Sequence, residues 1–385
     1  MSIIPAGYKQ TEIGVIPEDW EVCNLSEAVE FLDGQRRPIK SNERMSGIFP
    51  YYGASGIIDY VNDYIFNDDL ILLGEDGENI LSRNLPLAFR VSGKIWVNNH
   101  AHVLKPKEAF NIVFLTDYLE SLDYSLLNSG TAQPKLNKHS CLKIKISKPT
   151  KPEQQLIATA LSDTDALIES LEKLIAKKRQ IKQGAMQELL TPKEGWEVKK
   201  LGEVGDIVTG STPPTQNKEY WNGSIPWITP TDISNFEKNI YSSDREISHA
   251  GLRVIRKLPA NTLLVTCIAS IGKNAILRSN GACNQQINAI IPYAHYDVDF
   301  LYYLMENNNK YLLGKAGITA TLMISKKDFS EINFSFPTKT EQTAIAIILS
   351  DMDAEINALE SRLEKTRTIK SGMMHELLTG RIRLI

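Results

Sequence analysis

Residues 153–191 read EQQLIATALSDTDALIESLEKLIAKKRQIKQGAMQELLT, and residues 341–379 repeat them as EQTAIAIILSDMDAEINALESRLEKTRTIKSGMMHELLT. The two copies lie 188 positions apart and are identical at 22 of 39 positions. A repeat of this length predicts that one structural unit occurs twice in the chain.

The segments that precede the two copies also match each other, more weakly. This predicts four parts in the order globular, helical, globular, helical, with boundaries at 1–150, 151–191, 192–338 and 339–385. The matches are Trp20-Glu21-Val22, Leu25, Gly34, Pro38 and Pro50 with Trp196-Glu197-Val198, Leu201, Gly210, Pro214 and Pro226; Val97-Asn98 with Cys283-Asn284; and residues 130–149 with 317–337.

Both repeated segments are typical of long helices, because their apolar residues recur at three- and four-residue spacing. Thr150-x-x-Glu153 and Thr338-x-x-Glu341 are capping-box patterns, in which the glutamate is expected to reach back to the cap backbone. Pro192 and Gly380 follow as stop signals. Each helix would have roughly 38 residues and a length of ~57 Å. The residues expected to pair the helices are Ile157, Leu161, Ile168, Leu171, Ile175, Ile345, Leu349, Met352, Ile356, Leu359 and Leu363.

Charge predicts the direction of that pairing. In each copy the acidic residues precede the basic ones, so antiparallel helices would set each acidic half against the basic half of the partner. The alternative is that each gradient only stabilises its own helix through the helix dipole. We expect an antiparallel coiled coil that places the globular repeats at opposite ends, related by a pseudo-twofold axis.

The globular segments have the composition of strand-rich domains. In residues 51–66, aromatic and β-branched side chains are interrupted by Gly, Asn and Asp, and residues 260–277 are similar. Helix patterns occur mainly in residues 113–127 and 296–313. The expected fold class is therefore α+β, with two predominantly β domains separated by the long helices.

Composition and motifs exclude several classes of function. The chain has 385 residues, a hydrophobic fraction of 42% and a net charge of −3, so it is neither disordered nor a general phosphate binder. Apolar runs are too short for a membrane span, and no signal peptide is evident, so a cytoplasmic location is expected. The four cysteines are dispersed, and His100-x-His102 alone is a weak metal pattern. P-loop, dinucleotide-binding, nucleophile-elbow and zinc-protease motifs are absent, and we expect no catalytic residues, no cofactor and no metal.

Binding is the remaining class, and polar clusters in both repeats fit the reading of DNA bases. Arg and Lys pair with guanine, and Asn and Gln pair with adenine. Solvent-exposed turns are the alternative for any one of these residues. The expected DNA-binding residues are Gln35, Arg36, Arg37, Asn98, Asn99, His100, Gln133 and Lys135 in the first repeat and Thr212, Gln216, Lys218, Asn284, Gln285, Gln286, Thr319 and Thr321 in the second.

These features together give the chain a family likeness. It resembles the specificity subunit of type I restriction-modification systems over almost its whole length. The residues that carry the resemblance are the twin helices ending in ELLT (188–191 and 376–379), YYGASGI (51–57), LLGEDG (72–77), GTAQPKL (130–136), TG-x-TP (209–213) and IPWIT (225–229).

The resemblance implies that each globular domain is a target-recognition domain for one half of a bipartite DNA site. It also implies that the helices set the spacer and dock two methyltransferase subunits, which methylate adenine N6 with S-adenosylmethionine, and that ATP-dependent restriction subunits complete the complex. The first repeat has Asp33-Gly-Gln-Arg-Arg-Pro38 where the second has TG-x-TP. The two half-sites should therefore differ, and the target should not be palindromic.

Two other classes of protein stay open at this point. A coiled-coil adaptor that binds only proteins would explain the helices but not the polar clusters. An enzyme with an unrecognised site would act on DNA by itself when supplied with S-adenosylmethionine.

Overall fold

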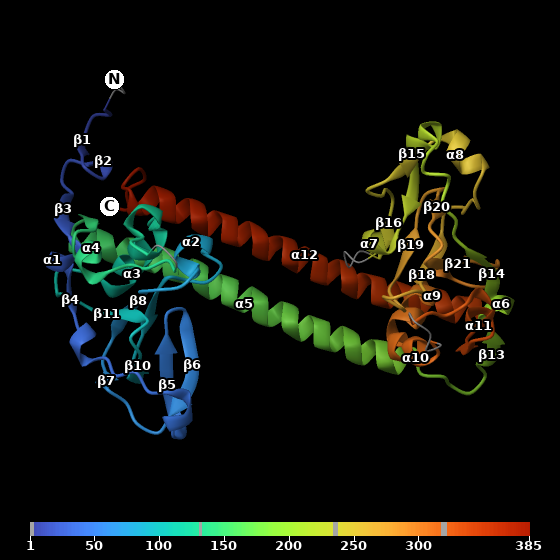
Figure 1. Cartoon of the computed structure of the whole chain (residues 1–385), viewed down its shortest axis with the longest axis horizontal. Coiled ribbons are helices and arrows are strands. Elements are labelled where there is room, and N and C mark those ends of the chain that lie inside the picture. Colours follow the sequence, from blue (N-terminus) through green and yellow to red (C-terminus); the bar gives the residue numbers. More distant parts are fainter. Residues whose placement is uncertain (1–3, 131–132, 234–237, 317–321) are drawn as a thin grey trace. The chain divides into compact units, whose positions relative to one another are not determined.

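The computed structural model describes residues 4–130, 133–233, 238–316 and 322–385 (Figure 1). The chain divides into two compact units: unit 1 contains residues 1–172 and 361–385, and unit 2 contains residues 173–360. Two long helices, α5 (Lys151–Leu189) and α12 (Lys339–Leu378), each contribute residues to both units. Unit 1 is therefore built from two separate stretches of chain, whereas unit 2 is one continuous stretch.

The long helices begin and end where their signals are in the sequence. α5 starts directly after Thr150, and α12 starts directly after Thr338. The hydroxyl of Thr338 accepts a hydrogen bond from the Glu341 amide at 3.4 Å, which satisfies one of the free amides of the first turn.

The glutamates of the two capping-box patterns have a different role from the expected one. The Glu153 carboxylate is 1% exposed and accepts hydrogen bonds from Trp20 Nε1 at 2.8 Å and from Arg383 Nε at 2.6 Å. In unit 2, Glu341 accepts from Trp196 Nε1 at 3.3 Å. A buried carboxylate needs such donors, so the repeated Trp–Glu pair ties each globular part to the start of its helix.

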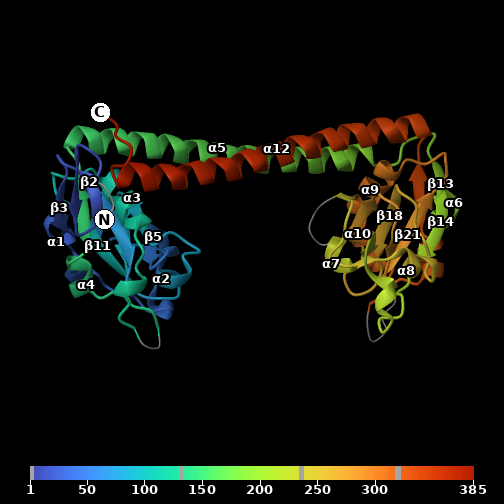
Figure 2. The same ribbon diagram turned by 90° about the horizontal axis from the view of Figure 1, so that it is seen from above.

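Within each unit the portions of α5 and α12 lie side by side in opposite directions (Figures 1 and 2). In each unit, acidic residues of one helix meet basic residues of the other. In unit 1 the pairs are Asp165–Lys370 and Glu172–Arg367, each at 2.6 Å. In unit 2 they are Lys178–Glu355 at 2.7 Å, Arg179–Glu360 at 2.6 Å and Lys182–Asp353.

The apolar residues expected to pair the helices divide between helix contacts and domain cores. Ile157 and Leu161 pack in the unit-1 core with Trp20, and Ile345 and Leu349 pack in the unit-2 core. Burying each such side chain is worth about 1.5–3 kcal/mol. Leu171, Ile175 and Ile356 are also buried, whereas Ile168, Met352, Leu359 and Leu363 are half-buried.

Unit 1 contains one mixed sheet, one antiparallel sheet and two short strand pairs among its described residues. One four-stranded sheet has the order β6-β5-β10-β7, with β10 parallel to β5, and the other has the order β4-β11-β8-β9, fully antiparallel. The strands are β1 (Tyr8–Thr11), β2 (Gly14–Pro17), β3 (Glu21–Asn24), β4 (Val29–Phe31), β5 (Ser46–Gly53), β6 (Gly56–Val61), β7 (Phe66–Asn67), β8 (Leu70–Gly74), β9 (Ala88–Val91), β10 (Lys94–Val97), β11 (Ala101–Pro106) and β12 (Lys145–Lys148). The helices are α1 (Leu25–Ala28), α2 (Asn79–Ser82), α3 (Ile112–Ser121), α4 (Lys138–Leu142) and the 3-10 turns η1 (Asp33–Gln35), η2 (Ser41–Glu43) and η3 (Ser125–Leu127).

Unit 2 repeats these pairings. β20 runs parallel to β15 as β10 does to β5, and β21 pairs antiparallel with β18 as β11 does with β8. The strands are β13 (Glu197–Lys200), β14 (Gly205–Thr209), β15 (Trp221–Ile228), β16 (Asn239–Ile240), β17 (Glu246–Ile247), β18 (Thr262–Thr266), β19 (Asn274–Leu277), β20 (Ala282–Cys283), β21 (Ile287–Pro292) and β22 (Asn333–Phe336). The helices are α6 (Leu201–Val204), α7 (Pro230–Ile233), α8 (His249–Arg253), α9 (Val298–Asn307), α10 (Asn309–Gly314), α11 (Lys326–Ser330) and the turn η4 (Lys218–Tyr220).

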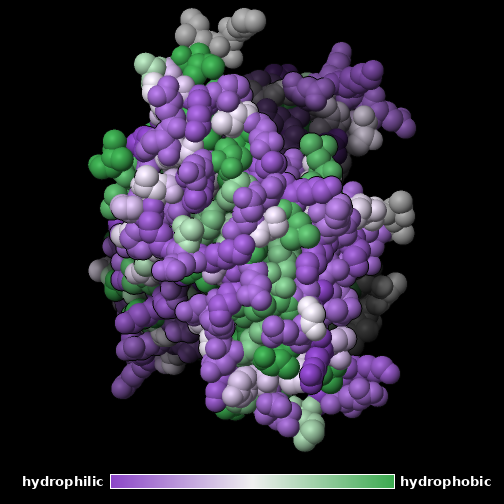
Figure 3. Space-filling view, turned by 90° about the vertical axis from the view of Figure 1, so that its left-hand side faces the viewer, coloured by the Kyte–Doolittle hydropathy of each residue, from purple (hydrophilic) through white to green (hydrophobic). Residues whose placement is uncertain are grey.

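One end-on face of the molecule is mainly polar. Hydrophilic residues make up most of the face shown in Figure 3, with smaller apolar patches between them. In the part of the chain that the structure describes, no helix has the length and apolar character needed to cross a membrane.

Candidate nucleic-acid interface

Each unit contains the same tight turn, closed by a buried asparagine. The Asn98 side chain is 4% exposed and accepts from the His100 amide at 2.8 Å, while the Asn98 amide donates to the Tyr52 carbonyl. Asn284 is 8% exposed and accepts from the Gln286 amide at 3.0 Å. Asparagine suits this position because its side chain can replace a backbone acceptor in a turn. The two asparagines therefore shape the turns, and Asn99, His100 and Gln285 beside them are exposed.

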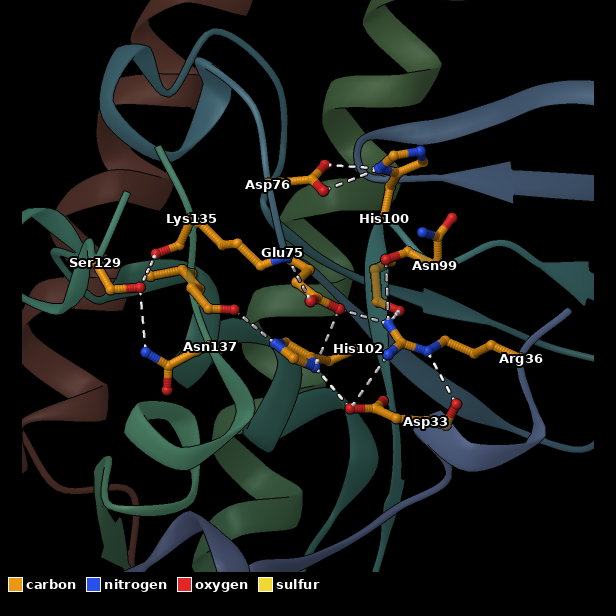
Figure 4. Close-up of polar contacts among 12 residues, drawn as sticks. Asp33, Arg36, Glu75, Asp76, Asn99, His100, His102, Ser129, Lys135 and Asn137 are labelled. Carbon is orange, nitrogen blue, oxygen red and sulfur yellow. Dashed lines mark hydrogen bonds and ion pairs between the residues drawn. The ribbon is translucent and has the colours of Figure 1, made fainter. Parts of the chain in front are cut away.

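In unit 1 this turn lies beside a set of five charged residues, here called the charge cluster: Asp33, Arg36, Glu75, His102 and Lys135 (Figure 4). Arg36 Nη1 donates to Glu75 and to the Ala101 carbonyl, both at 2.7 Å. Lys135 Nζ lies 3.3 Å from the other oxygen of Glu75. Glu75 therefore joins the 3-10 turn η1 to the segment that contains Lys135.

His102 is the buried centre of the charge cluster, with a side-chain exposure of 1%. Its Nδ1 lies 2.8 Å from Asp33 Oδ2, and its Nε2 lies 2.9 Å from the Leu136 carbonyl oxygen. Both ring nitrogens thus face acceptors, and only the imidazolium can donate from both.

The electrostatics agree with that geometry. Burial alone would lower the pKa of His102, but the hydrogen bonds and charges of its surroundings, Asp33 first among them, raise it to about 10. Burial works against ionised Asp33, yet the hydrogen bond from His102 holds the Asp33 pKa below its ordinary value. The Glu75 pKa is also lowered, by its bond from Arg36, against the effect of burial. These shifts favour the charged forms of Asp33, Glu75 and His102 at neutral pH.

Unit 2 builds the same frame from uncharged residues. The Ile324 amide donates to the Cys267 carbonyl at 2.9 Å, as the Leu136 amide does to the Glu75 carbonyl at 2.7 Å. These bonds and the sequence offsets identify the residues of unit 2 that occupy the places of the charge cluster, here called the neutral counterpart. Thr209 takes the place of Asp33, Thr212 of Arg36, Cys267 of Glu75, Asn288 of His102 and Met323 of Lys135.

The residue of this neutral counterpart at the position of His102 is Asn288, which is 2% exposed. It accepts from the Thr209 hydroxyl at 2.7 Å and donates to the Ile324 carbonyl at 3.5 Å. These contacts correspond to those of His102 with Asp33 and Leu136. Neutral hydrogen bonds therefore take the place of an ion pair at the same point of the fold.

The structure brings together some of the residues expected to bind DNA. Arg36 and Lys135 share Glu75, the Arg36 guanidinium lies 3.5 Å from the Asn99 carbonyl oxygen, and Thr212 donates to Gln285 at 2.6 Å. The exposed ones are Gln35, Arg37, Asn99, His100, Gln133, Lys135, Gln216, Lys218 and Gln285; Arg36, Thr212 and Gln286 are half-buried; Asn98 and Asn284 are buried; Thr319 and Thr321 lie outside the described residues.

The two histidines of His100-x-His102 face different partners. His100 Nδ1 lies 2.9 Å from both carboxylate oxygens of Asp76, whereas both nitrogens of His102 are occupied inside the charge cluster. Across the described ranges, no group of three or more His, Cys, Asp or Glu residues could hold a metal ion.

Glu75 and Asp76 were not among the residues expected at the interface, although both lie in the LLGEDG segment. Their position directly after a buried apolar strand, β8, is the signal that could have identified them. Charged residues at such a strand end lie at the sheet edge, where loops carry function.

Comparison with known families gives a match to each half of the chain. The family model described as "Type I restriction modification DNA specificity domain" matches residues 17–183 and again residues 193–366. The two matches together span well over half of the sequence, and they follow the internal repeat.

Individual relatives agree with the family match. A type I restriction enzyme specificity subunit of Methanocaldococcus jannaschii, MjaIX, is 37% identical over 168 residues, which are 42% of this chain and 38% of that protein. A second subunit of the same organism, MjaVIII, is 27% identical over 96% of this chain and 94% of its own length. The crystal structure of a type I restriction-modification S subunit from M. genitalium aligns with a TM-score of 0.62 at 13% identity, covering 93% of this chain and 96% of that one, which shows a shared fold.

Proposed function

This chain belongs to the family of type I restriction-modification DNA specificity domains, and from that membership we propose that it selects the DNA sequence on which a type I restriction-modification complex acts. Subunits of this kind are not themselves catalytic. The complex would contain two methyltransferase subunits for adenine N6 and ATP-dependent restriction subunits, working on double-stranded DNA in the cytoplasm.

The observation that carries the proposal is the duplicated turn with different residues around it. Asn98 and Asn284 close the same hydrogen-bonded turn in two domains, but the exposed neighbours are Asn99 and His100 in one domain and Gln285 in the other. A common frame that displays different hydrogen-bonding groups suits two readers of different base sequences. Each domain would therefore read one half of a bipartite, non-palindromic target.

The long helices would set the distance between the half-sites and dock the methyltransferase subunits. Half-sites on one face of DNA lie about 34 Å apart, one helical turn, and a helix of 39 residues, the length of α5, extends over roughly 59 Å. The cross-helix ion pairs inside each unit support a paired, antiparallel arrangement of the two helices.

Sequencing of adenine methylation in cells with and without the gene tests the function directly. We expect one bipartite motif, with unequal halves and a fixed unspecified spacer, to lose its methylation when the gene is removed. A protein-binding adaptor would leave the methylation map unchanged. Methylation by the purified chain alone, supplied with S-adenosylmethionine, would instead identify an enzyme.

Two changes to the chain separate the roles of its parts. Inserting four residues between Leu171 and Ile175 adds ~6 Å of helix and should lengthen the spacer by about one or two base pairs at ~3.4 Å each. An unchanged spacer would contradict the role of the helices. Exchanging residues 195–337 for the matching domain of a relative should alter one half-site only, and alteration of both would contradict separate reading.

A further inference from the structure

An arginine in unit 2 is stacked on two tryptophans. Arg245 precedes β17, and its Cζ atom lies 4.0 Å from the ring centroid of Trp221 and 5.1 Å from that of Trp227. The two indole rings meet edge to face, with centroids 5.1 Å apart. A guanidinium over an indole is held by the ring quadrupole, so Arg245 is fixed in position without using its N–H groups.

Those N–H groups are open to a ligand. Arg245 is exposed, and within the described residues its side chain has no hydrogen bond or ion pair besides the two stacking contacts. A planar guanidinium presents five donors, and its forked edge matches two neighbouring acceptors. The stacking thus orients a set of unused donors.

Unit 1 has an arginine over the ring at the equivalent position, but its guanidinium is already paired. Tyr51 precedes Trp227 by the repeat offset of 176, and Arg44 lies over the Tyr51 ring at 4.5 Å. The guanidinium of Arg44, however, pairs with Asp59 at 3.2 Å and donates to the Ile39 carbonyl at 3.1 Å. Arg44 therefore serves the fold, and it provides a stacked but occupied reference for Arg245.

The two tryptophans also connect Arg245 to the interface already described. Trp227 Nε1 donates to the Ser211 carbonyl at 2.9 Å, and Trp221 Nε1 donates to the Pro214 carbonyl at 3.3 Å. These carbonyls flank Thr212, which is bonded to Gln285. The two tryptophans thus link Arg245 to the segment that contains Thr212, and the hydroxyl of Thr212 links that segment to Gln285.

We propose that Arg245 is a specificity-determining residue that reads a guanine in the half-site of the second domain. Guanine presents N7 and O6 side by side in the major groove, and a fixed arginine fork can donate to both at once. The tryptophan stack reduces the side-chain freedom that such a contact would otherwise cost. The inference rests on the proposed function and adds to it the residue and the base.

Full-length variants co-expressed with the cognate methyltransferase subunit test this inference through sequenced methylation. Arg245→Ala should relax one guanine position of one half-site, with the methylation ratio of guanine over other bases falling roughly 10- to 100-fold. Arg245→Lys keeps the charge and can still reach guanine but lacks the fork, so it should relax the same position less than Arg245→Ala does. The matched control, Arg44→Lys, should leave the base preference of both half-sites unchanged.

The alternatives give different results. A phosphate contact would weaken methylation of all sequences alike and be restored by Arg245→Lys, and this would overturn the inference. An unchanged motif in Arg245→Ala would also overturn it, while the proposed function stands on the wild-type motif. A wild-type complex that methylates no defined sequence would overturn both. Thermal unfolding of each variant, compared with wild type, identifies any change caused by a loss of folding.

Discussion

The charge cluster of unit 1 and its neutral counterpart in unit 2 occupy the same place in two copies of one fold. In unit 1, buried His102 bonds to Asp33 and to a carbonyl, and in unit 2, buried Asn288 bonds to Thr209 and to the equivalent carbonyl. Burying charges costs desolvation that neutral groups of similar shape avoid. Unit 2 forms the equivalent contacts with uncharged residues, so the fold does not require buried charges at this place. In unit 1 the charged residues instead hold Arg36 and Lys135 beside the exposed turn.

Among substitutions, the largest effect is expected from removing one member of the buried ion pair. Asp33→Ala leaves the His102 imidazolium without its partner, and we expect unit 1 to lose about 3 kcal/mol of unfolding free energy at pH 7. Thr209→Ala, the matched change in unit 2, removes one neutral hydrogen bond and should cost about 1 kcal/mol. Urea unfolding followed by hydrogen exchange in β11 and β21 separates the two units. Equal losses would remove the distinction between charged and neutral centres.

The pH dependence of stability should also differ between the units. The folded-state pKa of His102 is about 10, above its ordinary value of 6.5, so its stabilisation is complete below pH 6.5 and is lost as pH rises through 10. Unit 1 should lose about 3–4 kcal/mol between pH 7 and 10. On the acid side, the lowered pKa values of Asp33 and Glu75 add stability that is lost as pH falls below their ordinary values of 3.8 and 4.5.

His102→Asn is the control for this prediction, because it installs the unit-2 residue and removes the alkaline titration. Hydrogen exchange in β11 should then show no loss of unit-1 stability between pH 7 and 10 beyond that of unit 2. A persistent alkaline loss in this variant would show that another group is responsible.

A double substitution tests whether the neutral centre can be transferred. Asp33→Thr with His102→Asn recreates the Thr209–Asn288 pair in unit 1, so the double variant should be about 1 kcal/mol more stable than the sum of the single changes indicates. A double-mutant cycle by urea unfolding measures this coupling. Strict additivity would mean that the two positions do not form one interacting pair.

The smallest effect is expected at the solvent edge of the charge cluster. Lys135 is 49% exposed and pairs with Glu75 at 3.3 Å, so Lys135→Met, which installs the unit-2 residue, should change unit-1 stability by no more than ~0.5 kcal/mol. A loss of several kcal/mol would place the lysine among the structural members of the cluster.

The long helices could be predicted from the sequence because their signals are local. The apolar spacing, the threonine before each helix and the proline or glycine after it lie within the segment itself, and α5 and α12 begin at the predicted caps. The role of Glu153 could not be predicted in the same way. Its partners, Trp20 and Arg383, lie 133 and 230 positions away, and only the tertiary fold brings them together.

The candidate site shows the same limit. Sequence alone indicated Arg36, Asn98 and Lys135 as polar residues in turns, because their residue types are typical of base contacts. It could not show that Asn98 is buried in its own turn or that Glu75 occupies the Arg36 guanidinium. Both facts depend on strand pairings between distant segments, such as β8 with β11, whose order no local pattern encodes.

The division of unit 1 between two stretches of chain determines when that unit can be completed during synthesis. A ribosome releases residues 173–360 as one continuous stretch, so unit 2 can fold while residues 361–385 have yet to emerge. Until then the nascent unit 1 lacks Leu377 and Leu378 of its core and the Arg383 guanidinium that neutralises Glu153. The N-terminal domain, though translated first, is therefore the one that must wait for its last contacts.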